Sequence, residues 1–74
     1  MEDFNMTVRE LINILKNFDD DMEVRIGIQQ TYGTDFAMNI REVEEYTVNA
    51  FYEEDYKAVV ITEGSQCGAV DYNG

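Results

Sequence analysis

The stretch "MTVRELINILKNF", residues 6–18, decides the first half of the fold. Thr7 is a good helix cap, and Glu10 follows at the spacing that completes a capping box over the free amides of the first turn. The apolar residues after the cap recur at helical spacing and form one stripe: Val8, Leu11, Ile12, Leu15 and Phe18. We expect the helix to end near residues 17–19, because a run of aspartates is unfavourable at the negative end of a helix dipole.

The rest of the chain has the patterns of strands and turns. Residues 22–29, "MEVRIGIQ", alternate between apolar and other residues, which is typical of a strand with one core face. Residues 36–48, "FAMNIREVEEYTV", and residues 56–63, "YKAVVITE", predict two more strands, joined by "NAFYEED" at 49–55. Residues 65–74 form either a loose tail or a short edge strand.

These elements predict an α+β fold. We expect one N-terminal helix packed on a three- to four-stranded antiparallel sheet, in a single small domain that spans residues 1–74. A chain of this length buries only about 60% of the surface that it exposes when unfolded, so the core must be thin. The residues expected in that core are Leu11, Leu15, Val24, Ile26 and Ile28.

The second strand changes parity along its length. Phe36, Met38 and Ile40 share one face, whereas Val43 would fall on the other. A bulge near Arg41–Glu42 would return Val43 to the core face, since one extra residue shifts the parity by one. Tyr46 and Val48 would then lie on the opposite face, which a single helix cannot also cover. A large exposed apolar face usually marks a contact surface.

The charge balance restricts the class of partner. The chain has 16 acidic residues, 5 basic residues and a net charge of −11. Such a surface disfavours nucleic acid and anionic membranes, and it favours a basic protein surface. The alternative is that the acids only keep a small protein soluble. Cys67 is the only cysteine and no signal peptide is evident, so we expect a cytoplasmic protein of a bacterial host cell.

The sequence offers little chemistry for catalysis. It has no histidine, which removes imidazole catalysis and histidine ligation of metals. The aspartates at 19–21 lack the glycine and the distal glutamate of a calcium-binding EF-hand loop. No phosphate-binding glycine motif is present, and a chain this short has no room for an enclosed active site. We therefore predict a protein that is not an enzyme and that needs no cofactor or metal.

The candidate site is the acidic and aromatic segment between the second and third strands. Alternate residues of a strand lie about 6.6 Å apart on one face, so that Glu42 and Glu44 form a carboxylate row, followed by Tyr46, while Glu45 faces the other way. DNA carries a phosphate about every 3.4 Å per strand, so the row falls near every second phosphate level. The alternative is a solvated edge whose charges prevent pairing with another sheet. The partner-binding candidates are Glu42, Glu44, Glu45, Tyr46, Phe51, Tyr52, Glu53, Glu54, Asp55 and Tyr56.

Two resemblances bear on function. "TVRELINILKNFDDDMEVRI" at 7–26 and "VVITEGSQ" at 59–66 resemble short proteins of Gram-positive bacteria and their phages, which carry the pattern T-V-x-E-L-I-x-x-L, D-x-E-V-x-I and V-x-I-x-E-G-S-Q. This resemblance implies an origin on a mobile element and assigns no activity. In size, charge and acidic hairpin, the chain also resembles phage anti-CRISPR proteins that act as DNA mimics. That likeness is one of physical style and transfers no residue roles.

The leading hypothesis is a non-enzymatic inhibitor that docks its acidic hairpin into the nucleic-acid-binding groove of a CRISPR effector such as Cas9. The alternative is a small homo-oligomeric structural or adaptor protein that uses the aromatic sheet face as a self-interface. The two differ in their partner, because the first binds a basic protein and the second binds only itself.

Overall fold

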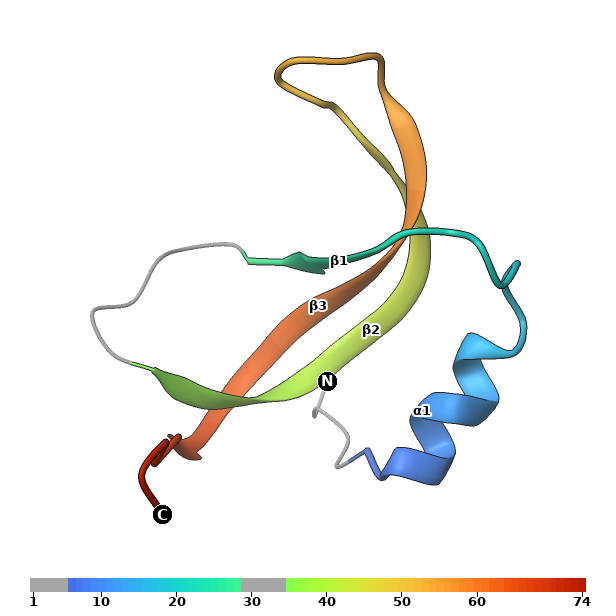
Figure 1. The fold of residues 1–74 in the computed structure, drawn as a ribbon. Coiled ribbons are helices and arrows are strands. Elements are labelled where there is room, and N and C mark those ends of the chain that lie inside the picture. Colours follow the sequence, from blue (N-terminus) through green and yellow to red (C-terminus); the bar gives the residue numbers. More distant parts are fainter. Residues whose placement is uncertain (1–5, 29–34) are drawn as a thin grey trace.

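The computed structural model describes residues 6–28 and 35–74. In chain order, its elements are α1 (Val8–Leu15), β1 (Val24–Gly27), β2 (Phe36–Val48) and β3 (Tyr56–Ala69). Figure 1 shows β2 and β3 as two long, curved ribbons that run side by side, with β1 alongside β3. The chain is therefore of the α+β class. Residues 65–69, for which the sequence predicts a loose tail or a separate edge strand, form the end of β3.

The capping box predicted for α1 is confirmed. The Thr7 hydroxyl oxygen accepts a hydrogen bond from the Glu10 backbone N–H at 3.2 Å, and the Glu10 carboxylate accepts one from the Thr7 backbone N–H at 2.9 Å. The bonds from Thr7 lower the pKa of the Glu10 carboxyl, because they favour its charged form. The helix ends at Leu15, somewhat before the predicted range, and Lys16 caps it. No helix within residues 6–28 and 35–74 has the length and apolarity that a membrane crossing requires.

The sheet is mixed, with strand order β1-β3-β2. β2 and β3 are antiparallel, as predicted, but β1 lies parallel to β3, with Val24 opposite Val59 and Ile26 opposite Ile61. The prediction of a wholly antiparallel sheet is therefore wrong for β1. The reason is that residue alternation within a strand is the same in both directions, so it gives no information on the partner. The continuous apolar run of β3, at residues 58–61, is typical of a strand that is buried on both faces, and Ala58 and Val59, which lie on opposite faces, are both buried.

The bulge predicted in β2 is confirmed. Ile40 lies opposite Glu63 and Glu42 lies opposite Thr62, so that Arg41 is the extra residue. Val43 then lies opposite Ile61 and is only 7% exposed. Beyond the bulge, Tyr46 and Val48 lie on the face opposite to Val43, because their partners Ala58 and Tyr56 alternate with Ile61 along β3.

The core is smaller than the sequence predicts and is centred on β3. Among the described residues, the buried hydrophobic side chains are Val43, Ala58 and Val59. The prediction that β1 supplies core residues is wrong, since Val24, Ile26 and Ile28 are 47%, 66% and 60% exposed. Leu11 and Leu15 are half-buried, and no residue of α1 is buried. Both figures show α1 on the β2 side of the sheet, away from β1, so the helix does not cover that edge.

Candidate protein-interaction site

The loop at 49–55 joins β2 to β3 at the closed end of the hairpin, at the top of Figure 1. One carboxylate holds it closed, because Asp55 Oδ1 accepts a hydrogen bond from the Ala50 backbone N–H at 3.2 Å. A carboxylate is well suited to this position, since it accepts such bonds without a proton of its own. Asp55 therefore shapes the loop as well as adding to its charge.

Two aromatic side chains occupy the loop. Phe51 is 93% exposed and Tyr52 is 100% exposed. Their ring centroids lie 6.3 Å apart with an interplanar angle of 74°, an edge-to-face pair. Neither ring contributes to the core. Exposed adjacent aromatic rings of this kind are typical of anchors that a partner buries.

The carboxylates of β2 lie as the alternation predicts. Glu42 and Glu44 share a face with Tyr46, since these residues lie opposite alternate positions of β3, at Thr62, Val60 and Ala58. Glu45 lies opposite Val59 and therefore faces the other way. The row of Glu42 and Glu44 leads along the strand towards the loop.

Local partners separate the six acids of the hairpin into two groups. Glu45 forms an ion pair with Lys57 at 3.6 Å, and Asp55 is bound by the loop backbone. Glu42 accepts a hydrogen bond from the Tyr46 hydroxyl at 2.6 Å, and this bond raises the pKa of the Tyr46 phenol. The second group has no hydrogen-bond or ion-pair partner among the described residues: Glu44, Glu53 and Glu54. These free carboxylates have the most to gain from a basic partner.

Tyr56 belongs to a different cluster from the loop aromatics. Its hydroxyl accepts a hydrogen bond from Arg25 Nε at 3.0 Å, and the Arg25 guanidinium carbon lies 5.6 Å from its ring centroid. Arg25 also forms an ion pair with Glu23 at 3.0 Å. The hydrogen bond that Arg25 donates to Tyr56, and then the one that it donates to Glu23, raise the pKa of Arg25. Sequence reasoning missed this cluster because Arg25 and Tyr56 are far apart in the chain and meet only through the parallel pairing of β1.

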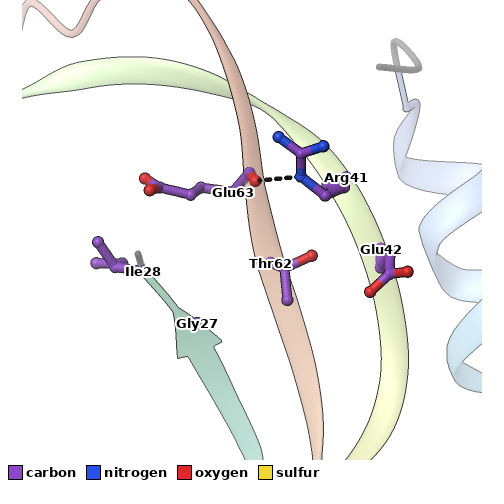
Figure 2. Close-up of a pocket in the computed structure, with 6 residues that line it drawn as sticks. All are labelled: Gly27, Ile28, Arg41, Glu42, Thr62 and Glu63. Atoms are coloured by element: carbon purple, nitrogen blue, oxygen red, sulfur yellow. Dashed lines mark hydrogen bonds between the residues drawn. The ribbon is translucent and has the colours of Figure 1, made fainter. Parts of the chain in front are cut away.

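A hollow of about 260 Å³ lies beside the bulge of β2 (Figure 2). Its Arg41 side chain is held in place, because Arg41 Nε donates to the Glu63 carbonyl oxygen at 3.1 Å. Thr62 Oγ1 is buried and has no hydrogen-bond partner among the described residues. The hollow contains no nucleophile paired with a base, so we assign it no reaction. Its lining residues are Gly27, Ile28, Arg41, Glu42, Thr62 and Glu63.

A wider and more open hollow, of about 530 Å³, lies on the sheet face that carries Tyr46. Its apolar lining includes Val48 and Val60, and Tyr46 stands at its border with 44% of its surface exposed. The sequence predicts an aromatic face here. The structure places Tyr46 and Tyr56 on that face, but each hydroxyl is already bound by a side chain of the same face.

No protein-family model matches this chain, and no curated protein or solved structure does so either. The resemblances to short phage proteins and to anti-CRISPR proteins therefore stay predictions.

Proposed function

We propose that this protein is a non-enzymatic inhibitor that docks the loop at 49–55 and the adjoining carboxylates of β2 into a basic groove that otherwise holds nucleic acid. The partner that we expect is a CRISPR effector such as Cas9, which would make the protein a phage anti-CRISPR protein. One observation carries the proposal: the exposed rings of Phe51 and Tyr52 are flanked by free carboxylates, in a segment without a single cation.

The electrostatics support a basic partner. Residues 42–55 contain six of the 16 acidic residues of the chain and no Lys or Arg. Arginine side chains bind carboxylates and phosphates in the same bidentate geometry, so a groove built for phosphates accepts carboxylates at suitable spacing. The net charge of −11 adds a long-range attraction that speeds the encounter.

The aromatic side chains supply what charge alone does not. Charged rims mainly raise association rates and set specificity, whereas desolvated anchors govern dissociation. Phe51 and Tyr52 are nearly or fully exposed, so they can be buried by a partner without loss of any contact to the core. A solvated edge that only prevents aggregation has no need of two adjacent exposed rings.

The test is competition with DNA for a purified, guide-loaded CRISPR effector. The informative variant is Glu44→Gln/Glu53→Gln/Glu54→Gln, which keeps shape and removes the three free charges. We expect it to associate roughly tenfold or more slowly at low salt, and we expect wild-type binding to weaken as salt is raised. The matched control is Asp19→Asn/Asp20→Asn/Asp21→Asn, which removes the same charge after α1 and should change association far less. Equal competition by the hairpin variant and wild type would leave the acids as a solvated edge only.

A further inference from the structure

The edge strand β1 presents a row of aliphatic side chains to solvent. Val24, Ile26 and Ile28 alternate along the chain, and the first two lie on the same face as Val59 and Ile61. All three are about half exposed or more, whereas Val59 beside them is 1% exposed. β-branched side chains in this alternation normally form the inner face of a sheet. The row is therefore a core face without a cover among the described residues.

The whole chain exposes more surface than a monomer of its size. A folded monomer of 8.6 kDa has an accessible surface of about 4,700 Å². This chain has 6328 Å². The excess of roughly 1,600 Å² is larger than the area of about 800 Å² that each partner gives up in a standard protein interface. The surface available is thus sufficient for a stable contact with another protein.

The outer edge of β1 also has free backbone groups. Val59 N–H donates to the Glu23 carbonyl oxygen at 2.9 Å, so the backbone groups of Glu23 point towards β3. In a parallel pair, every second residue of a strand directs both its N–H and its C=O group to the partner strand. Val24, Ile26 and Ile28 therefore direct these groups away from β3. Among the described residues, the one bond on that side joins Arg25 Nη1 to the Val24 carbonyl oxygen at 3.2 Å. An open edge of this kind is a template for another strand.

The distribution of charge favours the outer edge of β1 as the contact between two copies. Each chain carries −11, so two copies repel except where acids are few. Val24–Gly27 contains one arginine and no acid. The competing surface, the face of Tyr46, carries Glu42 and Glu44 and would bring carboxylates together.

We propose that a second copy of this chain pairs with β1 in antiparallel orientation, about a two-fold axis at Ile26, and joins the two three-stranded sheets into one. In this register Ile26 lies opposite the partner's Ile26, and Val24 lies opposite the partner's Ile28. Arg25 lies opposite the partner's Gly27, so no like charges face each other and the long side chain meets a residue without one. The row of Val24, Ile26 and Ile28 is thus complementary to itself. This inference does not rest on the proposed function.

The first test is the oligomeric state of the full chain by sedimentation at micromolar concentrations. We expect a dimer, and Ile26→Asp should weaken it by on the order of 100-fold, because two carboxylates would meet at the axis. The matched control is Val8→Asp, which places the same charge on an apolar residue of α1 that is 77% exposed. That variant should remain a dimer. A wild-type chain that stays monomeric at high micromolar concentration overturns the proposal.

The second test fixes the register and does not depend on the stability of Ile26→Asp. Cys67 is exposed and free, so it is first replaced by serine. In that background Ile26→Cys should form a disulfide-linked dimer on mild oxidation, because hydrogen-bonded antiparallel pairs have Cα atoms about 5.5 Å apart, within disulfide range. Val24→Cys faces the partner's Ile28 and should cross-link at least tenfold less. Equal cross-linking of the two variants, or loss of the dimer in Tyr46→Ala but not in Ile26→Asp, would contradict the proposed interface.

Discussion

The beginning of β3 and the loop at 49–55 are close in sequence and opposite in exposure. Ala58 and Val59 are 0% and 1% exposed and lie between two strands, whereas Phe51 and Tyr52 are 93% and 100% exposed. The first pair holds the sheet together. The second pair leaves its apolar surface in water, where it adds nothing to folding. The residues that stabilise the sheet and the residues that we propose to bind a partner are thus different residues of one hairpin, so each set can be changed while the other is kept.

The largest effect on stability should come from the buried residues near the beginning of β3. Val59→Ala removes buried methyl groups and leaves a cavity, so it should lower the free energy of unfolding by about 2–3 kcal/mol. Leu15→Ala removes more atoms, but Leu15 is only half-buried and should lower it by about 1 kcal/mol. Urea denaturation of both variants measures this difference. A larger loss for Leu15→Ala would mean that the core is centred on α1 instead.

Some features of the fold could be predicted from the sequence and others could not. The bounds of β2 and its bulge follow from parity, because Val43 can share a face with Ile40 only if one residue is extra. The position of β1 does not follow, since alternation reveals a core face but not which neighbour or helix covers it. The alternation therefore predicts that Val24, Ile26 and Ile28 are buried, whereas the structure exposes all three.

The candidate site shows the same limit. The sequence predicts the common face of Glu42, Glu44 and Tyr46 and the outward direction of Glu45, because these depend on neighbours in one strand. The pairing of Tyr56 with Arg25 depends on a contact across the sheet, and so it could not be predicted. Which acids are free also depends on side-chain partners. In the sequence the six carboxylates look alike, whereas the structure distinguishes three that have local partners from three that have none among the described residues.

Substitutions in the loop should leave stability nearly unchanged and weaken binding, in contrast to the substitution at Val59. Phe51→Ala and Tyr52→Ala should each change the free energy of unfolding by less than about 0.5 kcal/mol, because neither ring is packed. On the expected effector, each should raise the dissociation rate roughly tenfold, with little dependence on salt. Denaturation and surface-binding kinetics on the same samples test both statements. A destabilised Phe51→Ala variant would break the separation of roles, and unchanged dissociation would remove the rings from the binding site.

The smallest effect should come from the hydrogen bond from Tyr46 to Glu42, on the part of β2 that lies opposite Ala58 and Thr62. The carboxylate of Glu42 accepts a hydrogen bond from the phenol hydroxyl and raises the pKa of Tyr46, chiefly through that bond and to a smaller extent through burial and the charges of Glu42 and Glu44. Because the pKa is raised in the folded state, the bond stabilises the fold below the usual pKa of tyrosine. Its contribution is lost as the pH rises through the raised value.

Glu42→Gln should therefore return the pKa of Tyr46 most of the way towards its usual value, as measured by NMR titration of isotope-labelled tyrosine. Glu44→Gln is the matched control, because Glu44 acts on Tyr46 only through its charge and should lower the pKa far less. Equal shifts in the two variants would show that general negative charge, and not the hydrogen bond, sets the titration of Tyr46. Glu42 would then be as free as Glu44 and would join Glu53 and Glu54 among the carboxylates available to a partner.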